Sequence, residues 1–281
     1  MRGRLGTNMG KNKRLLSAEQ VKRQLLGMLA EFDQVCRDHD IRYSLDSGTL
    51  LGAIRHGGFI PWDDDVDLII PRPDYERILE HPEWFAGSCH LLSPNTPGSV
   101  HPFAKLINYS YRAQEASLDG IVDEYLWIDL FPADAVPDDC LEAEKLCQKQ
   151  VDLVKTYGRL ITNPKTAKSI PRRLVKTVAQ PLFRLIYPAS RIYKSIVGNA
   201  YSIPYGSTLN VANLIWPTVA KDRWFPASDF DNLVEKEFEG HSFYVIPHWD
   251  GYLKGLYGDY MKLPPEKDRS FHGAVVWPVD E

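Results

Sequence analysis

The feature that most constrains this chain is a run of acids that leads directly into an apolar segment. Four aspartates occupy the five positions from Asp63 to Asp67, and residues 68–70 are Leu-Ile-Ile. An apolar run of this kind predicts a buried strand. On such a strand Asp65 and Asp67 share one face, because side chains two positions apart point the same way. Two carboxylates on one buried face repel each other unless a cation lies between them, and hard oxygen ligands suit Mg²⁺ or Mn²⁺.

Two other interpretations of the acid run are simpler. A solvated acidic turn is the ordinary meaning of an aspartate run, but Trp62 and the apolar residues 66 and 68–70 resist solvation. An EF-hand loop needs Gly at its sixth position and Glu at its twelfth. Counted from Asp63, those positions hold Leu68 and Asp74, so an EF-hand is excluded. A metal site is the favoured interpretation.

The segment before the acids has the pattern of an anion site. Residues 41–45 predict a short strand, Ser47-Gly48 opens a helix that runs from Thr49 to His56, and Gly57-Gly58 can end it. A strand, a turn of small residues and a helix amino terminus together bind anions, because main-chain N–H groups point at the ligand. Ser47, Gly48 and Thr49 are therefore predicted phosphate-binding residues. The helix returns the chain to the aspartates, so phosphate and metal sites are expected to face each other.

A single acid also interrupts a second apolar strand. Residues 125–131 are apolar except for Asp129, and residues 101–108 predict another strand, which contains Lys105. A lone carboxylate inside a buried strand is unfavourable unless it is paired or bound to metal. Either a nearby Arg satisfies Asp129, or it belongs to the metal site.

Three blocks of this sequence resemble the LicD family. The first is GTLLGAIRHGGFIPWDDDVDL at 48–68, the second is WIDLFP at 127–132, and the third runs from Tyr252 to Pro265. Members of that family are phosphotransferases on a nucleotidyltransferase-like fold. Bacterial members transfer phosphocholine from CDP-choline to cell-surface glycans, and the animal fukutin group transfers ribitol phosphate from CDP-ribitol. The chain departs from the family pattern at Ser47, where Gly is common, and Asp46 is an extra acid whose role the sequence does not assign.

The resemblance implies an α/β (α+β) fold: a nucleotidyltransferase-like mixed sheet with helices and a basic helical insertion. We expect a disordered basic tail at 1–14, core at 15–135, the insertion at 136–203, and the C-terminal part of the core at 204–281. The four cysteines form no Cys-x-x-Cys pair, which disfavours zinc and a disulfide framework. Helices are expected at 17–36, 74–80, 139–161 and 248–257, and a hairpin that turns at Glu239-Gly240.

The net charge of −4 conceals a strong asymmetry. No Asp or Glu occurs from Val154 to Ala220, and 11 of the 33 Lys and Arg lie between residues 153 and 221, which leaves 22 basic and 37 acidic residues elsewhere. The basic stretch 170–196 is helical in pattern, with breaks expected at Pro181 and Pro188. It can lie on an anionic membrane or form a helical hairpin packed on the core, and the hairpin is slightly favoured. Nucleic acid is disfavoured, since the stretch lacks interleaved aromatics suited to base stacking.

The resemblance also implies a function and a location. We expect transfer of a phospho-alcohol group, phosphocholine or an alditol phosphate, from a CDP-linked alcohol donor to a hydroxyl of a cell-surface glycan such as teichoic acid or lipopolysaccharide, or of its lipid-linked precursor. CMP leaves. The amino-terminal residues lack the apolar region of a signal peptide, and no run is long enough to span a membrane. A cytoplasmic protein, with or without peripheral contact at the inner face of the membrane, is therefore expected.

Roles for single residues follow from the same resemblance. Asp65, Asp67 and Asp129 would hold one or two Mg²⁺ or Mn²⁺, with Asp129 either a ligand or the base that takes the acceptor proton. Positive charge for the donor would come from Arg55, Lys105 and Arg269. A choline cargo would call for an aromatic cage, for which Trp62, Trp127, Tyr252 and Tyr257 are candidates. Two alternatives remain open: a nucleotidyltransferase that transfers NMP to another acceptor, and a non-catalytic, metal-stabilised adaptor at membranes or glycan enzymes.

Overall fold

The computed structural model describes residues 14–97, 99–115, 118, 124–164, 170–220, 223–266, 269 and 274–279. In the helix Ile170–Ile186, the side chains at 170–175, 178 and 183 lie outside this description. The tail expected at 1–14 therefore falls outside the described residues except for Arg14. So do the basic residues Lys168, Lys267 and His272, and the side chains of Arg172 and Arg173.

One large mixed sheet organises the chain, with the strand order β1-β2-β5-β4-β10. β3 adds to β4, and β6 joins β5 to β7. Neighbouring strands are antiparallel except for β2 and β5, which are parallel. The strands span Ser44–Leu45 (β1), Asp67–Pro71 (β2), His90–Leu92 (β3), Ala104–Gln114 (β4), Glu124–Val136 (β5), Asn210–Asn213 (β6), Trp224–Pro226 (β7) and Val275–Pro278 (β10). A separate hairpin pairs β8 (Val234–Phe238) with β9 (His241–Val245).

The helices begin and end where the sequence carries capping signals. Ser17 and Gln20 form a reciprocal capping box at the start of α1, and Gly57 ends α2 in the left-handed conformation at φ 64°. Asp139 accepts from the first main-chain N–H groups of α4. The helices are α1 (Ala18–Asp38), α2 (Ser47–His56), α3 (Arg72–Glu80), α4 (Cys140–Ile161), α5 (Ile170–Ile186), α6 (Ala189–Ala200) and α7 (Trp249–Tyr257), with short 3-10 turns at Pro82–Trp84 and Ala227–Asp231.

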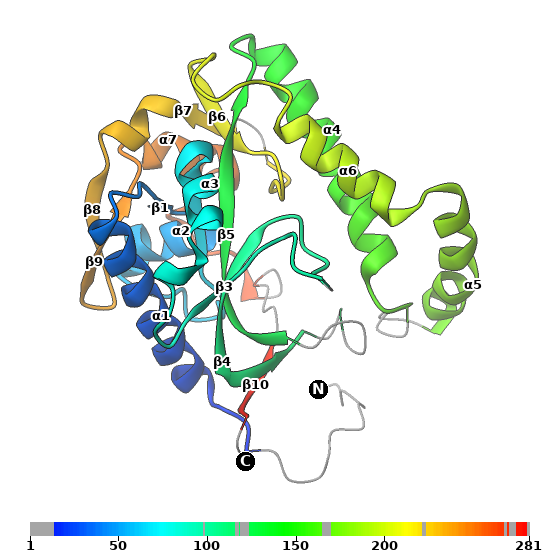
Figure 1. Cartoon of the computed structure of the whole chain (residues 1–281), viewed down its shortest axis with the longest axis horizontal. Helices are drawn as coiled ribbons and strands as arrows, with labels where there is room; N and C mark the ends of the chain where they lie inside the picture. The colour runs from blue at the N-terminus through cyan, green and yellow to red at the C-terminus, as the bar shows by residue number, and fades with distance from the viewer. Residues whose placement is uncertain are drawn as a thin grey trace.

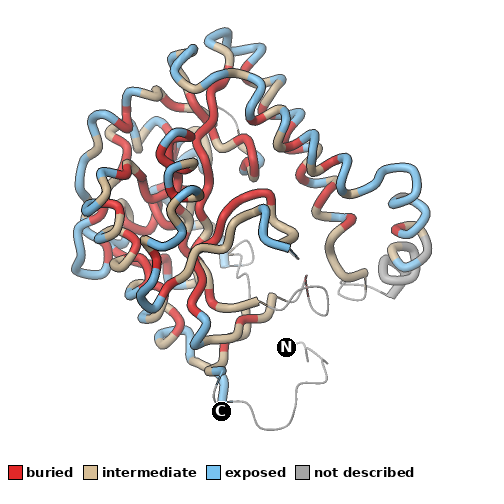
Figure 2. The backbone as a smooth tube through the Cα atoms, in the orientation of Figure 1, coloured by how far each residue is buried: buried red, intermediate tan, exposed pale blue. Residues whose placement is uncertain are grey.

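The long strand β5 separates two apolar cores. Figure 1 shows α1, α2, α3 and the β8–β9 hairpin on one side of β5, and the helices α4, α5 and α6 on the other. The larger core packs side chains such as Phe32, Leu50 and Ile70 between the first group and the sheet, and the smaller core packs α4 and α6 against the far end of β5 and β6 through Cys147 and Ile196. We call the helices α4, α5 and α6 the helical arm. The buried segments in Figure 2 follow the sheet, while α5 lies at the outer end of the helical arm. Those side chains of α5 that are described are largely exposed.

The α/β fold class is confirmed, and most expected elements are present. Three local expectations are wrong. Strand β2 begins at Asp67, so Asp65 precedes the strand, because the pairing of β2 with β5 begins at Asp67 opposite Asp129. Strand β5 runs five residues past Phe131, since its carboxyl half pairs with β6. Pro181 lies inside α5 rather than ending it; polar contacts of α5 with the end of α4, described below, hold the helix across the missing N–H.

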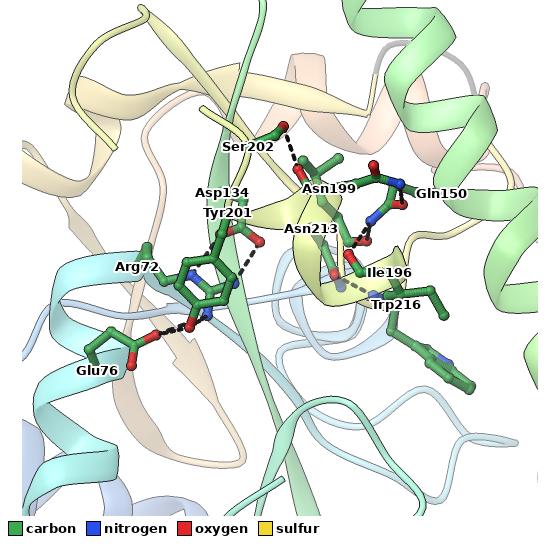
Figure 3. Close-up of polar contacts among 11 residues, drawn as sticks. Arg72, Glu76, Asp134, Gln150, Ile196, Asn199, Tyr201, Ser202, Asn213 and Trp216 are labelled. Carbon is green, nitrogen blue, oxygen red and sulfur yellow. Dashed lines mark hydrogen bonds and ion pairs between the residues drawn. The ribbon is translucent and has the colours of Figure 1, made fainter. Parts of the chain in front are cut away.

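Polar contacts attach the helical arm to the sheet (Figure 3). The buried Gln150 on α4 donates through Nε2 to Ile196 O at 3.0 Å and to Leu214 O at 2.7 Å, and its Oε1 accepts from Asn199 at 2.9 Å. These bonds tie α4 to α6 and to the segment that follows β6. The domain boundaries inferred from the sequence stay predictions. Across the residues that can be described, no helix is long and apolar enough to cross a membrane.

Candidate active site

Sheet register places three charged side chains in one row. Asp67 on β2 pairs with Asp129 on β5, and Asp129 pairs with Lys105 on β4. Directly paired residues on neighbouring strands project to the same face. Lys105 Nζ lies 3.1 Å from Asp129 Oδ1, and this lysine is only 5% exposed. The partner of Asp129 is thus a lysine from the adjacent strand rather than an arginine.

The amino end of α2 is fastened to the same row. Asp46 N–H donates to Asp67 O at 3.0 Å, and Asp67 N–H donates to Thr49 Oγ1 at 2.9 Å. Ser47, the first residue of α2, has φ 46°, a left-handed conformation that favours glycine. A Cβ on Gly48 would come within 2.7 Å of Asp63 Oδ2. The absence of a side chain at Gly48 therefore lets the aspartate run approach the start of the helix.

These elements surround a cleft of about 680 Å³. One wall is acidic and another is aromatic. Its lining includes Ser47, Gly48, Arg55, Trp62, Asp63, Asp64, Asp65, Asp67, His101, Phe103, Lys105, Trp127, Asp129, Phe131, Trp216, Tyr257, Asp259 and Lys262. The cleft thus collects residues from β2, β4, β5, α2, the segment after β6, and the chain that follows α7.

Most of the site residues predicted from the sequence meet in this cleft. Thr49 does not line it, because its buried hydroxyl is directed to the main chain of Asp67; it positions that aspartate instead. Arg269 is also absent from the lining, but its guanidinium lies 4.4 Å from the centre of the Trp62 ring, which does line the cleft. Arg55 lines the cleft and donates through Nη1 to Tyr260 O at 2.6 Å.

The acids of the cleft oppose one another electrostatically. Burial raises the pKa of Asp67 well above its ordinary value, and the charges of neighbouring carboxylates raise this pKa further. Those neighbours are Asp65, Asp129, Asp46 and Asp63. Asp129 Oδ1 is buried and has no hydrogen-bond partner, since its contact with Lys105 is an ion pair without hydrogen-bond geometry. Such a concentration of negative charge favours a cation that can take up these oxygens.

The donor set fits a hard divalent cation only in part. Carboxylate oxygens are the ligands that Mg²⁺ and Mn²⁺ prefer, and Asp65 and Asp67 supply them at the cleft. Among the described residues, however, no group of three or more His, Cys, Asp or Glu side chains is arranged to hold a metal ion. Asp129 contacts Lys105 through Oδ1. Magnesium or manganese at this site stays a prediction.

The structure assigns a position to Asp46. Its carboxylate is buried and accepts a hydrogen bond from the Tyr252 hydroxyl at 2.8 Å. Burial raises the pKa of Asp46, and the Tyr252 bond opposes that shift. Asp46 therefore links α7 to the start of α2 and, through its main chain, to Asp67. Because Tyr252 is itself buried in this contact, it is not available for an aromatic cage.

Cations of the chain already cover two of the other candidate cage faces. Arg269 lies over Trp62, and Lys105 Nζ lies 4.3 Å from the centre of the Trp127 ring. Each contact occupies one face of an indole ring that a quaternary ammonium would otherwise use. Of the four aromatics suggested by the sequence, Tyr257 remains as a cleft-lining ring.

Sequence reasoning missed an aromatic wall that contains a neutral histidine. The ring of His101 lies 5.2 Å from Phe103 and 6.1 Å from Trp216, measured between centroids. Burial and the charge of Lys105 lower the pKa of His101 to about 3, so the imidazole is uncharged near neutral pH. Both ring nitrogens are buried without a hydrogen-bond partner. No local pattern distinguishes His101 or Trp216, because the sheet and the segment after β6 bring them together.

Comparisons with known proteins agree with this geometry. A family model described as the LicD/FKTN/FKRP nucleotidyltransferase domain matches residues 40–153. The lipopolysaccharide cholinephosphotransferase LicD of Haemophilus influenzae is 31% identical over 267 residues, which cover 88% of this chain and 92% of that protein. The chain belongs to the LicD family. As a LicD-family member it is a phosphotransferase enzyme.

More distant relatives of this LicD-family chain match shorter segments. Ribitol 5-phosphate transferase FKRP of human and mouse is 45% identical over 60 residues, which cover 21% of this chain and 10% of FKRP. An uncharacterised protein of Rickettsia typhi is 39% identical over 70 residues, or 24% of this chain. The relation to the fukutin group expected from the sequence motifs is confirmed.

Proposed function

We propose that this LicD-family enzyme transfers a phospho-alcohol group from a CDP-linked donor to a hydroxyl of lipopolysaccharide, or of another cell-surface glycan or its lipid-linked precursor, and releases CMP. The observation that carries the proposal is the row of Asp67, Asp129 and Lys105 in a cleft that also contains the amino end of α2. Such an arrangement supplies carboxylates, a buried ammonium and a helix terminus to one cleft, where they can bind phosphate groups.

In the proposed reaction, the acceptor hydroxyl oxygen forms a bond to the phosphorus of the transferred group. The bond between that phosphorus and the CMP oxygen breaks, and CMP leaves with the electron pair. The acceptor proton passes to a base, and Asp129 is the candidate, unless it acts as a metal ligand instead. Lys105, 3.1 Å from Asp129, holds positive charge where the transferred phosphate would lie.

Asp65 and Asp67 are the residues that would hold Mg²⁺ or Mn²⁺. A divalent ion bound there would neutralise the donor diphosphate and the charge that develops on the leaving group. Thr49 would act indirectly, because its hydroxyl fixes the main chain of Asp67. Ser47 and Gly48 would receive phosphate at the start of α2, and Arg55 would add positive charge from the other end of that helix.

Phosphocholine is the favoured cargo, with ribitol phosphate or another alditol phosphate as the second candidate. The support is the extent of the match: the cholinephosphotransferase relative aligns with 88% of the chain, whereas FKRP aligns with 21%. Because cations lie over Trp62 and Trp127, a choline group would be recognised by Tyr257 or by Trp216 of the aromatic wall.

The test is to incubate the purified chain, with Mg²⁺, with CDP-choline, CDP-ribitol and CDP-glycerol in turn, with and without lipopolysaccharide, and to measure CMP. Release of CMP from CDP-choline, stimulated by the acceptor, is expected. Pyrophosphate released from a nucleoside triphosphate, with no CMP from any donor, would instead identify a nucleotidyltransferase. Metal binding without turnover of any donor would identify an adaptor.

A further inference from the structure

Helix α5 is held to the molecule by polar side chains. Gln180, which is 8% exposed, donates through Nε2 to the main-chain oxygens of Arg159, Leu160 and Thr162 at 2.9, 2.9 and 3.0 Å. Arg184 donates through Nε to Leu160 O at 3.1 Å. These contacts satisfy carbonyl groups at the carboxyl end of α4, which the helix leaves without intrahelical donors. The face of α5 that meets the molecule is therefore polar along this stretch.

The opposite side of the same stretch is apolar and exposed. Leu182, Leu185 and Ile186 are 59%, 79% and 66% exposed, and Tyr187 at the end of the helix is 50% exposed. With about 100° of rotation per residue, Leu182, Leu185 and Ile186 point away from the Gln180 and Arg184 side. A surface helix ordinarily turns its apolar stripe inward, so the described side chains between Gln180 and Ile186 have the reverse orientation. A cluster of large exposed apolar side chains marks an interaction surface. We call Leu182, Leu185 and Ile186 the α5 face.

Neither α5 nor the neighbouring helix α6 contains an acid. Glu144 and Asp152 on α4 line a pocket with Tyr187, which follows the end of α5. No Asp or Glu occurs from Val154 to Ala220, although the rest of the chain has 37 acidic residues against 23 basic ones. On the neighbouring helix α6, Arg191 and Lys194 are exposed, and Lys176 is half-buried on α5 itself. Apolar side chains among cations, without acids, have the composition of a helix that lies in the interface of an anionic membrane.

We propose that the α5 face binds an anionic lipid bilayer. Charge decides between the bilayer and a second copy of this chain: two α5 faces packed on each other would bring like charges together. Insertion of the apolar side chains between lipid headgroups removes them from water, while Arg191 and Lys194 meet the lipid phosphates. The inference is independent of the cargo. If the acceptor is lipid-linked, it also brings the enzyme to the surface that carries the acceptor.

The test is co-sedimentation of the full chain with vesicles of phosphatidylglycerol and phosphatidylcholine, and with vesicles of phosphatidylcholine alone. We expect binding to the anionic vesicles at low salt and weaker binding at high salt, because salt screens the cations. The triple variant Leu182→Gln, Leu185→Gln, Ile186→Gln should bind at least about tenfold more weakly. The double variant Arg191→Glu, Lys194→Glu should also lose at least about tenfold, and the remaining binding should depend less on salt.

The matched control is Leu141→Gln with Leu209→Gln, which removes two equally exposed apolar side chains elsewhere, 73% and 74% exposed. The control should bind as the wild type does. Thermal unfolding of each variant checks that it is folded, and CMP release from soluble CDP-choline tests the proposed function separately. If the wild type stays in the supernatant with anionic vesicles at low salt, or if the triple variant binds as well as the control, the proposal is overturned. A wild-type dimer that the triple variant abolishes, without vesicle binding, would assign the α5 face to self-association.

Discussion

At the scale of single residues, the site is defined by carboxylates that destabilise one another. Asp67 is half-buried beside four other acids, and Lys105 is the buried cation paired with Asp129. An enzyme that must attract a divalent ion and a diphosphate can retain such repulsion, because the ligand relieves it. Stability and activity should therefore respond in opposite directions when single carboxylates are neutralised.

The first prediction concerns Asp65 and Asp67. Asp65→Asn and Asp67→Asn should each abolish turnover, and excess EDTA should do the same to the wild type. Burial and neighbouring charges raise the folded-state pKa of Asp67 above its unfolded value. The contribution of Asp67 to the free energy of unfolding is therefore full below the unfolded pKa and is lost as pH rises through the folded pKa. At neutral pH, Asp67→Asn should thus raise the free energy of unfolding of the metal-free protein. CMP release and thermal unfolding in EDTA are the measurements; full activity in either variant contradicts the metal site.

The second prediction concerns Asp129. Asp129→Asn should lower turnover at least about a hundredfold, whether the residue is a base or a ligand. Metal titration separates these roles, because only loss of a ligand weakens Mg²⁺ binding. Asp134, another buried acid on β5, faces Arg72 instead, with its oxygens 2.6 and 2.8 Å from that guanidinium. Asp134→Asn is therefore the matched control and should lower stability without a comparable loss of rate per folded molecule. Unchanged rate and metal affinity in Asp129→Asn would make Asp129 structural.

The third prediction concerns His101 and pH. Its folded-state pKa is about 3, against 6.5 for an ordinary histidine, so the unfolded chain binds the proton more tightly. The contribution of the neutral His101 imidazole to the free energy of unfolding is full above pH 6.5 and is lost as pH falls from 6.5 toward 3. Between pH 7 and pH 4 the wild type should lose roughly 2–3 kcal/mol more than His101→Phe. Urea unfolding at the two pH values measures this, with the exposed His241→Phe as control. Parallel losses in wild type and His101→Phe would rule out the buried neutral imidazole as the cause.

At the scale of elements, helix α2 positions the site because it can approach its neighbours closely. A Cβ on Gly52 would lie 2.5 Å from the main-chain oxygen of Gly58, in the turn that leads to the aspartates. The β8–β9 hairpin supports the same turn, since Glu239 N–H donates to Gly57 O at 2.8 Å and Glu239 Oε1 accepts from Phe59 N–H at 3.0 Å. Backbone contacts of this kind leave little room for an added methyl group.

The fourth prediction follows from that packing. Gly52→Ala should destabilise the protein by about 1–3 kcal/mol, because α2 and the turn must separate. Gly198→Ala on α6, where an added Cβ meets nothing within 4 Å, should instead stabilise it by roughly 0.5–1 kcal/mol through helix propensity. Urea unfolding of both variants provides the comparison. Equal effects of the two substitutions would show that the close approach at Gly52 is not rigid.

At the scale of the whole molecule, Gln150 connects the helical arm to the cleft. It binds Leu214 O, two residues before Trp216 of the aromatic wall, and Trp216 N–H donates to Asn213 Oδ1 at 2.9 Å (Figure 3). The position of the arm and the shape of that wall are thus joined by hydrogen bonds. A change in one should alter the other.

The fifth prediction tests this connection. Gln150→Leu leaves two buried carbonyls and the Asn199 amide without their partner, so it should cost about 2–4 kcal/mol of stability. The exposed Gln148→Leu on the same helix is the control. In steady-state assays below the unfolding temperature, KM for the substrate that contacts the aromatic wall should rise more than kcat falls. A variant with wild-type stability and KM would show that the arm and the wall are independent.

Local sequence determined a large part of this structure. Capping residues set the starts of α1 and α4, Gly57 set the end of α2, and Glu239-Gly240, at φ 52° and 78°, set the hairpin turn. These features depend on backbone geometry and hydrogen bonds within a few residues, so a short stretch of sequence is enough to predict them. The motif around the aspartates likewise indicated the family and the acids of the cleft, because those residues are contiguous.

Only the tertiary structure decided how those acids are partnered. The register of β4 against β5 brings Lys105 to Asp129, and α7 brings Tyr252 to Asp46; in both cases the pairing depends on strands and helices distant in sequence. The reversed orientation of α5 also depends on its neighbour, because the carbonyl groups at the end of α4 bind its polar side and leave its apolar side exposed. Periodicity along one helix reports that it has two faces, and the partner determines which of them is buried.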